Sequence, residues 1–265
     1  MTADYLESSL LRAAGFRHAF FTRRGGVSQG PYASLNFSLS VGDAAEHVAR
    51  NFELAGDVVG VVPAGIFFLS QVHGAAVEVL TDAAAHQPDA RASVIQREGD
   101  ALLSSAPGVA CSVRTADCVP ILIGERRSGA VAAIHAGWRG LVRGVIEAGT
   151  LRLRELAQGA PGSAELVAAI GPHIGPESFE VGEDVAAELE GVSEAKGVVQ
   201  VRGGRRYVAL NRIVRAKLQA LGIAPAQIDE VGGCTLSEPD RFFSFRRDGK
   251  ESGRHLSVVV ARPPG

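Results

Sequence analysis

The chain is poor in sulfur-containing residues, in net charge and in long apolar runs. Its 265 residues include three cysteines and one methionine, and the formal net charge is −2. The small net charge argues against a general nucleic-acid-binding protein, which usually carries a strong basic excess. No apolar run approaches the roughly 20 residues of a membrane-spanning helix, so no membrane partner is expected.

The cysteines and the first residues of the chain indicate a reducing compartment. Cys111, Cys118 and Cys234 cannot all pair within one chain. The first seven residues carry two acids and no basic patch before an apolar stretch, unlike a secretory signal peptide. We therefore expect a cytoplasmic protein whose cysteines are core residues, nucleophiles or metal ligands.

The pattern of apolar residues predicts one mixed α/β domain over residues 1–265. With 46% of its residues apolar, the chain can bury a large core. Runs rich in Val, Ile and Phe predict strands at 16–22, 66–72, 77–80, 101–104, 109–113, 119–123, 130–135, 166–170, 207–210, 242–245 and 256–260. Helical periodicity predicts helices at 44–55, 138–157, 183–190 and 211–221, with a loop or lid at 81–99 and a turn at 158–163. Strands and helices do not alternate strictly, which argues against a simple doubly wound sheet.

Three segments place a possible metal ligand at the edge of a predicted strand. They are residues 70–74 with His73, 114–120 with Cys118, and 133–140 with His135. Two histidines and a cysteine suit zinc, and three protein ligands leave a fourth position for water or substrate, as in catalytic sites. The spacing alone is weak support, because a lone cysteine in an apolar segment is more often a core residue. We keep that interpretation for Cys111 and Cys234.

The same segments resemble the YfiH-like family, also named laccase-domain or multicopper polyphenol oxidase proteins and described as purine nucleoside phosphorylases with adenosine deaminase activity. The resemblance rests on Gln-Val-His-Gly at 71–74, Thr-Ala-Asp-Cys at 115–118 and His-Ala-Gly-Trp-Arg-Gly at 135–140, with further matches at 25–28, 34–36, 170–174, 179–182, 243–249 and 252–254. One departure is Phe179, where the family often has tyrosine.

The resemblance implies a single α/β (α+β) domain with mixed β-sheets and flanking helices. It also implies that His73, Cys118 and His135 bind zinc. The implied reaction is phosphorolysis of adenosine or inosine, with methylthioadenosine as a further candidate and inorganic phosphate as co-substrate. Deamination of adenosine by a zinc-activated water is the second implied activity.

Other residues of these motifs are candidates for handling protons or substrate. Asp117 is a candidate catalytic acid or base, or instead a residue that caps its own turn. Guanidinium groups suit phosphate, and amide or imidazole groups could bind the base or a water, so the candidate substrate-binding residues are Arg23, Asn36, Gln71, Arg139, His173, Arg246 and Arg254.

Several alternatives remain open. Cys118 could be the nucleophile of a hydrolase with His73 or His135 as base, and the family is also associated with editing of peptidoglycan precursors. A copper-dependent polyphenol oxidase is disfavoured, because the only methionine is Met1 and none of the seven histidines forms a His-x-His pair. Copper could still occupy the His-Cys-His site. We expect a monomer or weak homodimer that binds nucleosides and phosphate.

Overall fold

The computed structural model describes residues 2–157 and 165–265, so the predicted turn at 158–163 lies outside the described residues. The helices are α1 Ser9–Ala13, α2 Ala45–Val59, α3 Asp82–Ala85, α4 Ala90–Val94, α5 Trp138–Val142, α6 Val145–Leu156, α7 Glu183–Gly191, α8 Leu210–Ala220 and α9 Phe245–Asp248. The strands are β1 Tyr5–Leu6, β2 His18–Phe21, β3 Ile66–Phe67, β4 Val77–Val79, β5 Ala101–Ser104, β6 Ala110–Thr115, β7 Val119–Glu125, β8 Val131–Ala136, β9 Leu166–Ile170, β10 Glu180–Val181, β11 Val199–Arg202, β12 Arg205–Val208, β13 Ile228–Glu230 and β14 His255–Val260.

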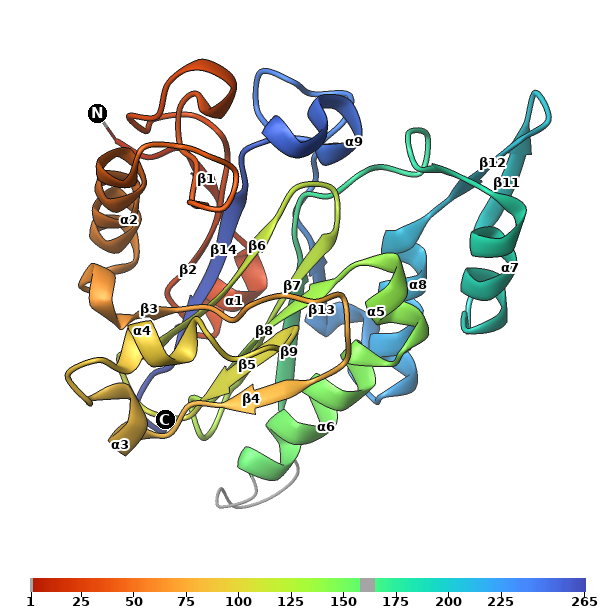
Figure 1. Ribbon diagram of the computed structural model, residues 1–265. Helices are drawn as coiled ribbons and strands as arrows, with labels where there is room; N and C mark the ends of the chain where they lie inside the picture. Colours follow the sequence, from red (N-terminus) through yellow and green to blue (C-terminus); the bar gives the residue numbers. More distant parts are fainter. Residues whose placement is uncertain (1, 158–164) are drawn as a thin grey trace.

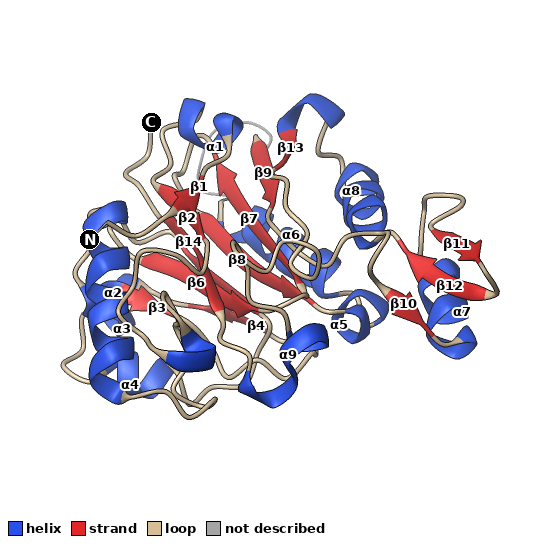
Figure 2. Cartoon of the chain, turned by 90° about the horizontal axis from the view of Figure 1, so that it is seen from above, coloured by secondary structure: helices blue, strands red, loops and turns tan. Residues whose placement is uncertain are grey.

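Two large sheets form the centre of the domain. One has the order β1-β2-β14-β6-β3 and the other the order β13-β9-β7-β8-β5-β4. Both mix parallel and antiparallel neighbours: β14 runs antiparallel to β2 and β6, whereas β3 runs parallel to β6. An apolar cluster that includes Phe20, Val113, Leu122, Ala133 and Val259 joins the facing sides of the two sheets. Figure 2 shows the two sheets stacked in this way.

Helices cover the outer faces of both sheets. The α2 helix packs on the five-stranded sheet, and α5, α6 and α8 pack on the six-stranded sheet (Figure 1). Alternate residues of β7 therefore point to different layers: Ile121 and Ile123 face the helices, and Leu122 faces the other sheet. Because strands such as β7 are buried on both faces, they appear in the sequence as continuous apolar runs.

A smaller three-stranded sheet, in the order β10-β12-β11, projects from one side together with α7 (Figure 1). The domain is thus a mixed α/β fold with several mixed sheets and flanking helices, as predicted. Within the described ranges, no helix is both long and apolar enough to cross a membrane.

The predicted strands at 101–104 and 166–170 match β5 and β9 residue for residue, but two other predictions are wrong. The strand predicted at 66–72 stops at Phe67, because the following backbone turns to donate hydrogen bonds to the carboxylate of Asp100. No strand forms at 242–245. The Oγ of Ser244 instead caps the first turn of α9 by accepting from the N–H of Arg247 at 3.3 Å.

The helix predictions need two corrections. The helix predicted at 138–157 is divided into α5 and α6 by Gly144, whose φ of 81° lies in the left-handed region. The expected loop or lid at 81–99 contains α3 and α4, which are too short to show an apolar stripe in the sequence. The short strands β1, β10, β11 and β13 were not predicted, because two to four residues show little periodicity.

Candidate metal centre

Three side chains of the predicted metal site meet at one end of the six-stranded sheet. His135 lies near the end of β8, and Cys118 immediately precedes the adjacent antiparallel strand β7. His73 comes from the loop between β3 and β4. One ligand atom from each residue lies within 4.8 Å of the others, and Sγ of Cys118 is 3.8 Å from Nε2 of His73. In the described part of the chain, these residues form the one cluster of this kind.

The donor set fits zinc. In a tetrahedral site with Zn–S near 2.3 Å and Zn–N near 2.0 Å, the sulfur and nitrogen ligands lie about 3.6 Å apart. The separation of 3.8 Å between Cys118 and His73 is close to that value. The rings of His73 and His135 are edge-to-face with centroids 4.8 Å apart, so both can point nitrogen atoms at one ion. His73, Cys118 and His135 would hold the metal.

Asp100 organises this centre and was missed by the sequence analysis. Its buried carboxylate lies 2.7 Å from Nδ1 of His135, which leaves Nε2 of that ring for a metal. The same carboxylate accepts hydrogen bonds from the backbone N–H groups of His73 at 3.0 Å and Gly74 at 2.6 Å. One side chain therefore orients two of the three ligands. The available signal was an acid directly before the apolar strand 101–104.

The close packing of the centre requires glycine at position 137. A Cβ atom there would lie 2.7 Å from Cδ2 of His73 and 3.0 Å from Sγ of Cys118. Gly137 precedes the first residue of α5, and its φ of −73° is open to any residue. Close approach by the two ligands, rather than backbone conformation, is therefore what excludes a side chain.

The electrostatics favour a thiolate at Cys118. Burial by itself would raise the pKa of this thiol, but the charge and hydrogen bond of His135 and the hydrogen bond of His73 outweigh it and lower the pKa. Burial opposes protonation of His135, yet Cys118 and Asp100 raise the pKa of its ring. Hydrogen bonds from His135 and the backbone likewise outweigh burial and lower the pKa of Asp100. The charges of the centre are mutually compensating.

Backbone strain is concentrated at the same place. His73 has a φ of 56° and Asp117 a φ of 91°, and they are the two non-glycine residues with positive φ in the described chain. Such conformations cost about 1–3 kcal/mol each and cluster at functional sites. The Asp117 carboxylate accepts hydrogen bonds from Oγ1 of Thr235 and from the backbone N–H of Arg246, both at 2.6 Å. This side chain thus joins the ligand turn to α9.

Three further candidate residues lie outside the ligand set. Burial lowers the pKa of Arg254, while the charges of Cys118 and Asp117 oppose that shift, and its Nη1 donates to the carbonyl oxygens of Ser252 and Gly253. Arg139 is exposed in α5 and stacks on Trp138 at 4.6 Å. His173 is buried, and its Nδ1 lies 2.8 Å from the carbonyl oxygen of Gly171.

The remaining candidates make hydrogen bonds within the protein. Nε and Nη1 of Arg23 donate to the backbone carbonyls of Ala33 and Pro239. Asn36 is fully buried and hydrogen-bonds Ser38, Asp43 and the N–H of Arg254.

Gln71 and Arg246 are similarly engaged. The Gln71 amide pairs with both backbone groups of Arg114 at 2.8 Å and so forms a side-chain bridge to β6. The exposed Arg246 donates from Nη1 to the carbonyl of Glu180 at 2.8 Å. A role missed by the sequence analysis is that of Arg143, whose Nη1 donates to the carbonyl of His73 at 3.1 Å.

This fold is shared with known proteins. Residues 17–262 match the family described as multi-copper polyphenol oxidoreductase laccase, so the chain belongs to that family. The laccase-domain resemblance predicted from the motifs is therefore confirmed.

Curated relatives carry a more specific name. A protein named purine nucleoside phosphorylase from Bacteroides thetaiotaomicron is 35% identical over 95% of this chain and 94% of its own length. Purine nucleoside phosphorylase YfiH from Escherichia coli is 37% identical over 90% of each chain. The crystal structure of YlmD from Geobacillus stearothermophilus superimposes with a TM-score of 0.87 at 30% identity, over 97% of this chain and 96% of that one.

Proposed function

We propose that this protein is a zinc-dependent purine nucleoside phosphorylase that acts on adenosine and inosine and also deaminates adenosine. The observation that carries the proposal is the convergence of His73, Cys118 and His135 on one point, with Asp100 orienting the two histidines. The name purine nucleoside phosphorylase, carried by relatives that align over nearly the whole chain, supports the substrate class.

The metal and the chain would divide the work. When bound, zinc would supply a Lewis acid and lower the pKa of a bound water, which suits attack on C6 of adenine. The chain contributes the buried carboxylate of Asp100, which holds His135 in the tautomer with Nε2 free for the metal. Gly137 leaves room for the ligands to approach one another.

Phosphorolysis needs a site for phosphate beside the ribose. In the reaction, the bond from C1′ to the purine nitrogen breaks, a bond from C1′ to a phosphate oxygen forms, and the base leaves with a proton. We assign phosphate binding to Arg254 and Arg139, because a guanidinium pairs well with phosphate and the charge of Cys118 acts on the pKa of Arg254. Asp117 is a positioning residue in this scheme, since both its oxygens already accept hydrogen bonds.

His173 is our candidate for the group that takes a proton from the attacking phosphate or water and passes it to the leaving base. Its Nδ1 faces the carbonyl of Gly171, which leaves Nε2 as a hydrogen-bond acceptor. Burial lowers the pKa of this ring and keeps it neutral near pH 7. A neutral imidazole can accept or relay a proton.

One observation also favours a cysteine-dependent hydrolase. His135 contacts Cys118 on one side and Asp100 on the other, and the two histidines lower the pKa of the Cys118 thiol. Such an order of nucleophile, base and orienting acid is typical of cysteine nucleophiles. The two functions differ in their requirement for metal and phosphate.

The deciding experiment measures hypoxanthine release from inosine by the purified protein of known metal content. We expect release that requires both phosphate and one zinc per chain. His135→Ala and Cys118→Ser should each lose the metal and lower kcat/KM more than about a hundredfold. Cys111→Ala is the matched control, since Cys111 is buried within β6.

Each alternative has its own result. Hydrolysis that continues after zinc is removed, is independent of phosphate and is lost in Cys118→Ser would support the hydrolase. No phosphate-dependent release at full zinc occupancy would contradict the proposal. Formation of inosine from adenosine, followed in the same samples without phosphate, tests the deaminase activity separately.

A further inference from the structure

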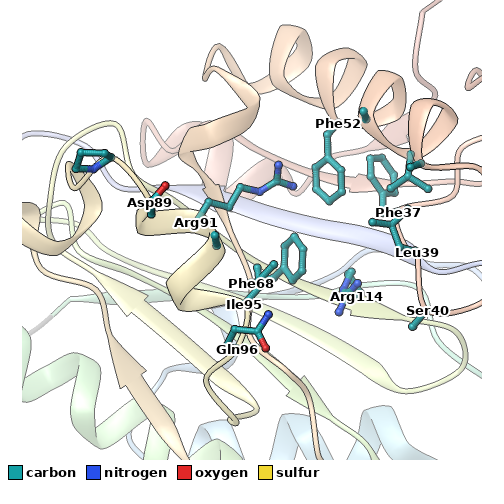
Figure 3. A pocket seen from close by; sticks show the side chains of 15 residues that line it. Phe37, Leu39, Ser40, Phe52, Phe68, Asp89, Arg91, Ile95, Gln96 and Arg114 are labelled. Atoms are coloured by element: carbon teal, nitrogen blue, oxygen red, sulfur yellow. The ribbon is translucent and has the colours of Figure 1, made fainter.

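A cavity lies beside α2 and α4. It has a volume of about 600 Å³ and opens between α2, the segment around Leu39 and α4. Its walls are largely aromatic and aliphatic, with Phe37, Phe52 and Phe68 among them (Figure 3). None of the three metal ligands lines it. We refer to it below as the Arg91–Arg114 pocket.

Two arginines place their guanidinium groups against the aromatic rings of this pocket. Arg114 lies 4.2 Å from the centroid of Phe68. Arg91 lies 4.3 Å from the centroid of Phe52 and 5.5 Å from that of Phe68. In Figure 3, Phe68 lies between the two arginines. Planar guanidinium groups stack well on aromatic faces, and their outer edges then remain free to donate hydrogen bonds.

Neither guanidinium has an acidic partner. Across residues 2–157 and 165–265, no carboxylate lies within 4.0 Å of Arg91 or Arg114. Nε of Arg114 is buried and has no hydrogen-bond partner among these residues. Burial, together with the charges of Arg254 and Arg91, lowers the pKa of Arg114 to about 10.

An arrangement of this kind is costly unless something compensates it. A buried donor without a partner loses about 1–3 kcal/mol relative to one that is satisfied, and two neighbouring cations repel each other. An anion that reaches both guanidinium groups would satisfy the orphaned donor and offset the repulsion. The surrounding Phe37, Phe52 and Phe68 would at the same time exclude water from the body of the ligand.

Access to the pocket is open on the side of Leu39. This residue lines the cavity and is 55% exposed. A cavity that offers both an exposed apolar residue and two guanidinium groups suits an amphipathic ligand.

We propose that the Arg91–Arg114 pocket binds a small organic anion, in which a phosphate or carboxylate group is joined to a flat apolar body. The acidic group pairs with Arg91 and Arg114, and the apolar body lies against the phenylalanines. The site is separate from the metal centre and does not depend on the phosphorylase proposal. Gln71 connects the two regions. It stands two residues before His73, and its side-chain amide pairs with the backbone of Arg114.

Isothermal titration of the full-length protein tests the proposal with three probes. Phenyl phosphate and phenylacetate each combine an anion with an aromatic body, whereas benzyl alcohol lacks the charge. We expect at least one of the two anions to bind, and benzyl alcohol to bind at least tenfold more weakly. Inorganic phosphate should also bind at least tenfold more weakly, because it lacks the apolar body.

Substitutions locate the binding. Arg114→Met and Arg91→Met keep an unbranched stem but remove the charge, and each should weaken binding of the anion at least tenfold. Arg97→Met is the matched control, because Arg97 is exposed on the segment just after α4 and contacts Glu78. It should bind as the unmodified protein does. Thermal unfolding of all three variants checks that they remain folded. If only one arginine variant is folded, it is enough to locate the binding.

The outcomes separate this site from the metal centre. Binding that survives in His73→Ala and is lost in Arg114→Met or Arg91→Met supports the proposal. Binding that is lost in His73→Ala but kept in both arginine variants would assign the anion to the metal centre and overturn it. Absence of binding of both anions to the unmodified protein at millimolar concentration would also overturn it.

Discussion

The metal centre and the Arg91–Arg114 pocket differ in whether their charged groups have partners of opposite charge. At the metal centre each ionisable group has a partner: Asp100 bonds His135, and His135 and His73 both contact Cys118. In the pocket, Arg91 and Arg114 lie near each other with aromatic rings as their neighbours. The first region has the paired donors that a cation site requires. In the lining of the second, within the described residues, the acid Asp89 forms no ion pair with Arg91 or Arg114, so both guanidinium groups remain available to a ligand.

This difference has a physical meaning. A buried group with a complete set of partners holds one geometry, which is what a metal site requires. A buried group that lacks a partner lowers stability and is typical of sites whose missing partner is a ligand. Removal of a charge should therefore weaken metal binding at the metal centre, whereas at the pocket it should raise the free energy of unfolding.

The largest effect is expected when the partnering at the metal centre is broken. Asp100→Asn keeps the shape of the side chain but removes its charge, so the affinity for zinc should fall about 10–100-fold, as for other residues that orient metal ligands. Competition with a chelator measures this affinity. Thermal unfolding of the zinc-free proteins measures separately what the lost hydrogen bonds contribute to stability. An unchanged affinity for zinc would show that Asp100 does not act on the ligands.

A second prediction tests the geometry of the same centre. Gly137→Ala places a methyl group against His73 and Cys118, so zinc affinity should fall about tenfold, because the ligands can no longer approach closely. Gly191→Ala is the matched control, since a Cβ at that position meets no atom within 4 Å. Equal zinc affinity in the two variants would mean that the centre can rearrange without loss.

A buried histidine of β14, His255, adds a test of how the fold keeps a single group uncharged. Burial lowers the pKa of His255 to about 3, and the cations Arg23, Arg254 and Arg247 contribute to the shift. The folded state therefore keeps this ring neutral. As pH falls below 6.5, the unfolded chain takes up a proton that the folded chain does not, so stability is lost progressively down to about pH 3.

The expected slope is up to about 1.4 kcal/mol of unfolding free energy per pH unit for this one histidine. Urea unfolding at pH 7, 6 and 5 measures it. His255→Gln should show a shallower slope between pH 6 and 5. His86→Gln should keep the slope of the unmodified protein, because His86 is exposed. A slope unchanged in His255→Gln would contradict the assignment.

The smallest effect is expected in the pocket. Arg114→Met removes one of two half-buried cations without an acidic partner and keeps apolar contact with Phe68, so the free energy of unfolding should rise by about 1 kcal/mol. Urea unfolding without organic anions measures the change. A decrease larger than the loss of one cation–π contact would show that the pocket is satisfied as it stands.

Much of the site was accessible from the sequence because its signals are local. His73, Cys118 and His135 lie in short motifs beside apolar runs, and the structure brings their ligand atoms within 4.8 Å. The central strands were predictable for the same reason, since burial of both faces leaves continuous apolar runs such as β7 and β9. The short helices α3 and α4 were missed, because four or five residues carry too little periodicity.

The sequence by itself determined the composition of the centre, the mixed α/β class and the family. Only the tertiary structure decided which charges are partnered. Asp100 reaches His73 and His135 across 27 and 35 residues of chain. Arg91 and Arg114 become neighbours only when α4 packs beside β3, which pairs with β6. Local patterns report how deeply a segment is buried, whereas the pairing of buried charges depends on which distant segments meet, and packing alone determines that.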